Sequence, residues 1–113
     1  MKLKLFWKDI EGNSYILGTL YKEDNKYIFE IVDKDELKKA TRAGCFGIGE
    51  INLFYKTHTS DDLFYFFKRR IPPKEHVKID EILKHLGLEE YDEMEILRKT
   101  KGILNTDRYY LEE

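Results

Sequence analysis

The side chains best suited to catalysis or metal binding in this chain are three histidines and one cysteine. His58, His76 and His85 lie much farther apart than the three- or four-residue intervals that bring two imidazoles onto one helical face around a metal. Cys45 has no second cysteine, so neither a thiolate ligand pair nor an intrachain disulfide can form. We therefore expect exposed histidines, a partly buried thiol in a loop, no metal site and no catalytic residues.

A glycine-rich segment, GCFGIG at 44–49, has the composition of a phosphate-binding loop but not its order. A Walker loop requires a Gly-Lys pair followed by Ser or Thr, and a dinucleotide loop requires G-x-G-x-x-G between a strand and a helix. Here the order is G-x-x-G-x-G, and it follows an expected helix. The segment is predicted to be a turn-rich connector, and no cofactor is expected.

The acidic run EEYDEME at 89–95 is the densest cluster of carboxylates in the chain. Acidic side chains are favoured near a helix N-terminus by the helix dipole, so a solvated helix start explains this run. A surface for a basic partner is the alternative explanation. Neither interpretation provides a nucleophile with its base, so the chain is expected not to be an enzyme.

The length of 113 residues predicts one domain, residues 1–113, with one hydrophobic core. Hydrophobic residues make up 42% of the chain, which is far above the hydrophobic content of disordered proteins. The net charge of −2 creates no general attraction to nucleic acid or to anionic membranes, so any such binding must be local. No apolar run has the length of a membrane helix, and we expect a cytoplasmic protein with no membrane partner.

The first third of the chain has the pattern of β-structure. Polar turns at 11–14 and 23–26 divide residues 3–32 into three segments, each predicted to be a strand of an antiparallel meander. Gly18 interrupts the second segment and indicates a β-bulge or a close approach of two backbones. The first segment alternates with one face expected to be buried, and the third segment alternates in the same way. The alternating sets are Leu3, Leu5 and Trp7 in the first segment, and Tyr27, Phe29 and Ile31 against Ile28, Glu30 and Val32 in the third.

Helical patterns follow, and one strand ends the chain. A short helix is expected after Asp33 or Asp35, a second over residues 79–86, and a third after a capping box that begins at Asp92. Residues 103–111 predict a last strand added to the meander. The expected fold class is α+β: three meander strands plus a C-terminal strand, with three to four short helices packed on the sheet.

The stretch DDLFYFFKRRIPPKEH, at 61–76, combines aromatic rings, three consecutive cations and a double proline. A capping box between Thr59 and Asp62 predicts a helix that ends before Pro72, with residues 52–58 as an extended connector. On that helix Phe67 is the centre of the buried face, because a step of about 100° per residue leaves several apolar residues beside it. The residues sharing its stripe are Leu63, Phe64 and Ile71.

Tyr65 and Phe66 fall outside this stripe and need cover from another surface. One alternative is the chain itself, for instance the loop at 44–54, and the other is a separate molecule. Rings beside arginines have the composition of an interface hot spot. The residues expected to contact a protein partner are Tyr65, Phe66, Lys68, Arg69 and Arg70. Stacking of single-stranded nucleic acid on the same rings, with the cations on phosphates, is the alternative function.

Two series of short motifs resemble known families. One resembles the small β-rich N-terminal subdomain of HipA-type toxin kinases, and its motifs are LFWKD at 5–9, LGTLY at 17–21 and YIFEI at 27–31. The other resembles the segment preceding the HIRAN domain of some bacterial proteins. Its motifs are AGCF at 43–46, LFYFFKRRIP at 63–72, LGL at 86–88, ILRKTKG at 96–102 and TDRYYLE at 106–112.

The resemblance implies a HipA-like N-terminal module that stands alone. In three-component relatives of the HipA system a small protein of this kind, HipS, binds the kinase and restrains it as an antitoxin. A kinase catalytic lobe does not fit in 113 residues, and neither a lobe nor a HIRAN domain is present. DNA binding by HIRAN domains is therefore not implied. The expected function is a non-catalytic, regulatory module that binds a HipA-type serine/threonine kinase.

Overall fold

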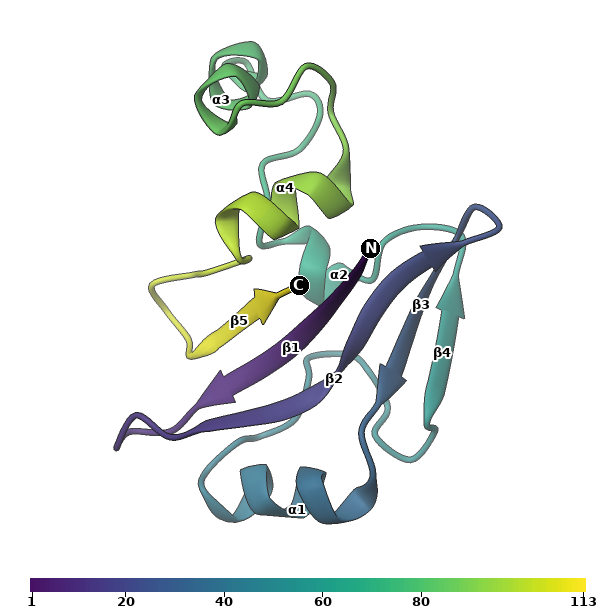
Figure 1. The fold of residues 1–113 in the computed structure, drawn as a ribbon, viewed down its shortest axis with the longest axis vertical. Helices are drawn as coiled ribbons and strands as arrows, with labels where there is room; N and C mark the ends of the chain where they lie inside the picture. The colour runs from purple at the N-terminus through teal and green to yellow at the C-terminus, as the bar shows by residue number, and fades with distance from the viewer.

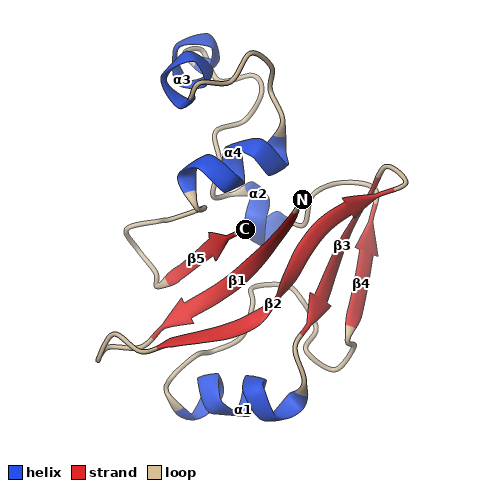
Figure 2. Ribbon diagram, viewed as in Figure 1, coloured by secondary structure: helices blue, strands red, loops and turns tan.

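A five-stranded antiparallel sheet organises the molecule, and four short helices accompany it (Figures 1 and 2). The computed structural model describes all residues, 1–113. The strand order is β4-β3-β2-β1-β5, so the first three strands form the predicted meander and the last strand joins it beside β1. The strands are β1 (Lys2–Lys8), β2 (Ser14–Glu23), β3 (Lys26–Ile31), β4 (Thr57–Ser60) and β5 (Tyr109–Glu112).

The predicted alternation holds in the meander. Leu3, Leu5 and Trp7 are buried on one face of β1, and the same face of β3 buries its own alternate residues. Between β1 and β2 the register shifts after Leu5, which pairs with Gly18, so that Phe6 pairs with Ile16. This is the irregularity that the glycine in the second strand predicted.

The helices begin and end largely where the local sequence directs. Asp33 caps the first helix by accepting a hydrogen bond from the Glu36 amide, and Asp92 caps the fourth by accepting one from the Glu95 amide. The third helix ends at Gly87, whose left-handed backbone (φ 75°) suits glycine. The helices are α1 (Lys34–Arg42), α2 (Tyr65–Lys68), α3 (Ile79–Leu86) and α4 (Glu93–Thr100).

The prediction of a helix starting at Thr59 is wrong. Residues 57–60 form the edge strand β4, which pairs with β3, and helical structure spans just the four residues of α2. β-Branched Thr57 and Thr59 suit an extended strand, and pairing with β3 satisfies backbone groups that a helix terminus would leave free. The last strand is also shorter than predicted, since residues 103–108 form turns that precede β5.

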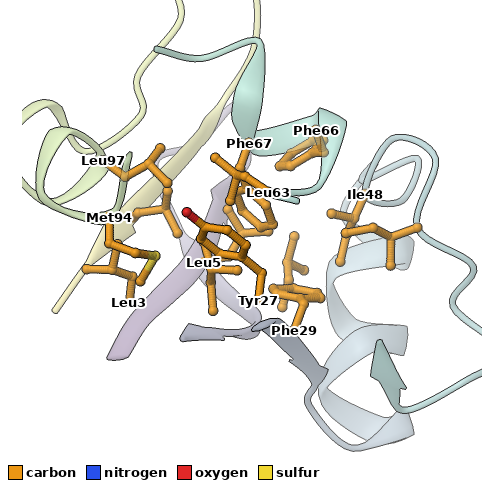
Figure 3. Packing of buried hydrophobic residues seen from close by; sticks show 14 of the residues in the cluster. Leu3, Leu5, Tyr27, Phe29, Ile48, Leu63, Phe66, Phe67, Met94 and Leu97 are labelled. Carbon is orange, nitrogen blue, oxygen red and sulfur yellow. The ribbon is translucent and has the colours of Figure 1, made fainter. Parts of the chain in front are cut away.

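The core lies between one face of the sheet and a layer formed by α2, α4 and the loop at 44–51 (Figure 3). Phe67 of α2 packs on Phe29 of β3 with ring centroids 5.4 Å apart. Helix α1 lies at one end of the sheet, whereas α3 stands apart at the opposite end, beyond α4 (Figure 1). The sheet and α4 therefore enclose α2, and the residues predicted to bind a partner lie on α2 and in the two positions after it.

Candidate functional site

The predicted partner-binding residues divide into an inward and an outward group on α2 and just after it. Phe66 and Arg70 are buried, whereas Tyr65, Lys68 and Arg69 are exposed. Helical spacing accounts for this division, because Phe66 and Arg70 are four residues apart and lie on one face of α2 and the turn that follows it. Both side chains, Tyr65 and Phe66, lie outside the Phe67 stripe as the spacing indicated, but Tyr65 is exposed whereas Phe66 is buried, so the prediction that Phe66 contacts a partner is wrong.

Phe66 is enclosed by the chain itself, with 2% of its surface exposed. The Phe66 ring packs edge-on against the Tyr109 ring of β5, with the ring centroids 5.0 Å apart. A Cβ built at Gly49 would lie 2.8 Å from Cδ1 of Phe66. The Phe66 amide also donates to Glu50 Oε2 at 3.2 Å. The loop at 44–51 therefore supplies the intramolecular cover that was one of the two sequence-based alternatives, and Phe66 is not available to a partner.

Arg70 is a structural residue rather than a contact residue. Its Nη2 lies 2.6 Å from Asp107 Oδ2, and its Nη1 donates to the Gly102 carbonyl at 2.9 Å. The guanidinium is also held between two rings, with its centre 4.3 Å from the Phe66 centroid and 5.2 Å from the Tyr109 centroid. Since 1% of the Arg70 side chain is exposed, the prediction that Arg70 contacts a partner is wrong.

The outward residues line an open groove of about 970 Å³, and we call it the tyrosine–lysine groove. Its volume is at the upper end of the range for ligand sites. Tyr65, Lys68 and Arg69 form one side, and the rest comes from the N-terminus, the end of β2, the start of β3, the segment after α2 and the start of α4. Those remaining lining residues are Met1, Lys22, Tyr27, Ile71, Pro73, Lys74, Glu75, Tyr91, Asp92, Glu93 and Met94.

Three lysines that line the groove form no ion pair. Lys22, Lys68 and Lys74 take part in no ion pair, although the Lys22 ammonium lies 5.0 Å from the centre of the Tyr27 ring. Arg69 is partly engaged, because it lies 3.6 Å from Asp107. Tyr65 is 68% exposed, which makes it the most solvent-accessible ring in the groove. These side chains are free to make new contacts.

The tyrosine hydroxyls on the opposite side of the groove are already bonded. Tyr27 donates to Glu93 Oε1 at 2.8 Å, and Tyr91 donates to the Pro72 carbonyl at 2.7 Å. Burial, and then the bond to Glu93, raises the pKa of Tyr27 far above its ordinary value, and burial likewise raises the pKa of Tyr91. Both tyrosines therefore stay neutral and act as fixed walls of the groove.

Sequence reasoning missed Tyr27, Tyr91 and Glu93 as parts of this site. Tyr27 has the alternating position of a core residue, and it is indeed buried, with 6% of its surface exposed. Nothing in the sequence pairs it with Glu93, which follows it by 66 residues. The acidic run at 89–95 was the available signal, since two of its carboxylates line the groove.

The histidines and the cysteine do not assemble into a reactive cluster. Cys45 is buried beside Tyr109, with Sγ 3.8 Å from the hydroxyl oxygen, and His58 Nε2 of β4 bonds to the Asn52 and Tyr55 carbonyls in the preceding loop. His76 and His85 line a second, smaller pocket of about 400 Å³. No group of three or more His, Cys, Asp or Glu side chains is placed to hold a metal ion.

Comparisons of the chain with family models, with curated proteins and with solved structures gave no match. The HipA-like and HIRAN-associated resemblances therefore remain predictions that depend on the motifs alone. None of the four helices combines the length and the apolar character that a membrane crossing requires. The class that the fold defines is a small α+β domain, and its candidate site is the tyrosine–lysine groove.

Proposed function

We propose that this chain is a non-catalytic interaction module that binds a protein partner in the tyrosine–lysine groove. The observation that carries the proposal is the meeting of an exposed ring, Tyr65, with unpaired Lys68 and Lys74 in one concave surface. Interface hot spots combine an aromatic anchor with charged residues around it, which is the composition of this groove. The same three residues belong to the stretch at 61–76 that the sequence singled out.

The protonation states of the groove side chains suit binding better than catalysis. Glu93 already accepts a hydrogen bond from Tyr27, and the raised pKa of Tyr27 makes that hydroxyl a poor base or acid near neutral pH. The groups that remain free are the lysine ammonium groups, which form ion pairs, and the Tyr65 ring, which packs against apolar side chains. A binding role uses every one of them and requires no chemical step.

The partner that we propose is a HipA-type serine/threonine kinase in the cytoplasm, with this chain as its regulatory or antitoxin-like component. The support for this partner is the resemblance of the motifs at 5–9, 17–21 and 27–31 to the N-terminal subdomain of such kinases. Those motifs lie on β1, β2 and β3, the strands that form the meander. The groove supports a contact surface, and the resemblance supports the identity of the partner.

The test asks whether a kinase-like protein is encoded beside this chain, whether the two co-purify, and whether the chain lowers the phosphoryl-transfer activity of that protein; absence of such a neighbour contradicts the proposed partner. We expect a stable complex and lower kinase activity, and we expect Tyr65→Ala with Lys68→Ala to weaken the complex by about tenfold or more. Tyr55→Ala with Lys38→Ala is the matched control, because both residues are exposed and neither lines the groove. A complex that tolerates the groove variant as well as the control contradicts the proposal.

Binding of single-stranded nucleic acid is the alternative function, favoured by the exposed Tyr65 ring beside lysines. Phosphate contacts release counterions, so such binding weakens steeply as salt increases. A titration with oligothymidine at low and at high salt distinguishes the two functions. Oligonucleotide binding that the groove variant abolishes, without any kinase complex, would replace the proposed function by this one.

A further inference from the structure

The charged side chains of the tyrosine–lysine groove differ in whether they already have a partner within the chain. Among its carboxylates, Glu93 accepts from the Tyr27 hydroxyl and Asp92 accepts from the Glu95 amide, which leaves Glu75 as the carboxylate without a bond in the structure. Among its cations, Lys68 and Lys74 have neither an ion pair nor a hydrogen bond. The bonds to Glu93 and Asp92 come from neutral groups and leave both negative charges in place, so the lining sets four cationic side chains (Lys22, Lys68, Arg69 and Lys74) against three carboxylates. The lining thus has a small excess of positive charge, although the whole chain has a net charge of −2.

The groove also has apolar surface between these charges. Ile71 and Met94 are buried at its base, with 7% and 6% of their surfaces exposed, and the half-buried Tyr91 ring lies beside them. The Tyr91 hydroxyl is held by the Pro72 carbonyl, which fixes this ring against the segment after α2. Together with Tyr65 on the rim, this base provides a place for one apolar side chain of a ligand.

We infer that the groove recognises an acidic peptide segment of its partner that carries an aromatic or large aliphatic side chain. The carboxylates of the segment meet the ammonium groups of Lys68, Lys74 and Lys22, and its apolar side chain packs against Tyr65 and the base formed by Ile71 and Tyr91. The inference rests on the proposed function, because it names the chemistry of the segment that the proposed partner supplies. Charge complementarity of this kind sets the choice of partner.

The distribution of carboxylates favours a peptide over a nucleic acid. A nucleic-acid strand places a negative charge at every nucleotide, and such a strand would bring phosphates close to Glu75, Asp92 and Glu93, which line the same groove. A peptide places its carboxylates at chosen positions and its neutral or basic side chains at others. It can therefore meet the lysines without meeting the groove acids.

The experiment measures fluorescence anisotropy of three short labelled peptides mixed with the full chain. One peptide has a tryptophan flanked by aspartates and glutamates, the second replaces those acids by asparagine and glutamine, and the third replaces them by lysine. We expect the acidic peptide to bind, the neutral peptide to bind about tenfold more weakly and the basic peptide not to bind. Affinity for the acidic peptide is expected to fall as salt rises.

Charge-reversal variants locate the binding site. Lys68→Glu with Lys74→Glu is expected to lower the affinity for the acidic peptide by about tenfold or more, because attraction becomes repulsion. Lys34→Glu with Lys38→Glu on α1 is the matched control, since these two lysines are exposed, form no ion pair and lie outside the groove. Unchanged far-ultraviolet circular dichroism of both variants shows that folding is not the cause.

Three outcomes overturn the inference: tighter binding of the basic or the neutral peptide, an equal effect of the α1 control, or tighter binding of oligothymidine than of the acidic peptide. None of these outcomes depends on the kinase complex. If Tyr65→Ala with Lys68→Ala breaks that complex while the acidic peptide fails to bind, the proposed function is supported and the inference of an acidic segment is wrong. If the complex tolerates that variant, the proposed function itself is wrong.

Discussion

At the residue scale, two ion pairs of equal length are expected to differ in their contribution to stability. Lys26 to Asp61 and Arg70 to Asp107 both measure 2.6 Å, but the first pair is 53% and 81% exposed and the second 1% and 18%. We expect Asp107→Ala to lower the free energy of unfolding by about 3 kcal/mol, because it leaves a buried guanidinium without its carboxylate. Asp61→Ala is expected to change the free energy of unfolding little, because water and dissolved ions screen that exposed pair. Urea unfolding of both variants measures the difference.

Simultaneous replacement of both partners separates the burial penalty from the attraction. Arg70→Met with Asp107→Leu is expected to be closer to wild type in stability than Asp107→Ala, since no charge remains buried. Equal losses for Asp107→Ala and Asp61→Ala would contradict the role that we assign to burial. Asp61→Ala leaves the groove lining unchanged, whereas Asp107→Ala also removes the carboxylate beside Arg69, so unchanged circular dichroism is the check on folding for both variants.

Single residues also show where sequence reasoning reaches its limit. Arg69 and Arg70 are adjacent and chemically identical, and the sequence predicted the same exposed role for both. Both arginines reach the Asp107 carboxylate, but Arg70 is also enclosed by the Gly102 carbonyl and the Tyr109 ring. A local pattern contains no information about those distant groups. Tyr65, by contrast, was correctly separated from Phe67, since neighbouring residues on one turn point in different directions.

At the element scale, the packing of β3 requires a glycine at position 18, beside the β-bulge in β2. A Cβ built at Gly18 would lie 2.5 Å from Phe29 Cζ and 2.6 Å from the Glu30 carbonyl oxygen. Because backbone and a buried ring both crowd this position, we expect Gly18→Ala to destabilise the fold by about 3 kcal/mol. Thr19→Ala, on the half-buried neighbour, is the control and is expected to cost about 1 kcal/mol or less. Thermal unfolding of the two variants makes the comparison, and equal melting temperatures would show that the bulge tolerates a side chain.

Elements with strong local signals were predicted well, and elements that depend on distant pairing were not. Helix α3 has apolar spacing and a terminal glycine, and α4 has a capping aspartate, so both follow from neighbouring residues. Strand β4 exists because β3 offers an unpaired edge, which the sequence of residues 57–60 does not record. Its formation also leaves α2 just four residues long, and the cover of Phe66 comes from Tyr109 and the loop at 44–51, which are distant in sequence.

At the scale of the whole molecule, the fold class followed from the order of strand and helix patterns, whereas the groove did not. The meander, the added C-terminal strand and the short helices are all present as expected. The groove, however, forms where β3, the segment after α2 and the start of α4 come together. Its shape is a property of the tertiary arrangement, so only its α2 side was accessible from local sequence.

The tyrosines of the whole molecule predict how stability changes at alkaline pH. A bond to Glu30 and burial raise the pKa of Tyr21 to about 12, and burial together with Glu93 raises the pKa of Tyr27 further. Burial and neighbouring Cys45 also raise the pKa of Tyr109. Each folded-state pKa lies above the unfolded value near 10, so each stabilising contribution is complete below about pH 10 and is lost as pH rises through the folded-state pKa.

We therefore expect the urea midpoint to be nearly constant from neutral pH to about pH 9 and to fall steadily above about pH 10. Tyr27→Phe tests the cause, because it removes the ionisable hydroxyl and the bond to Glu93 but keeps the ring. This variant is expected to be about 1 kcal/mol less stable at neutral pH and to lose stability less steeply at alkaline pH. Tyr55→Phe, on an exposed tyrosine without such a bond, is expected to follow the wild-type profile. A Tyr27→Phe profile as steep as that of wild type would show that the Tyr27–Glu93 bond does not couple the groove wall to the stability of the fold.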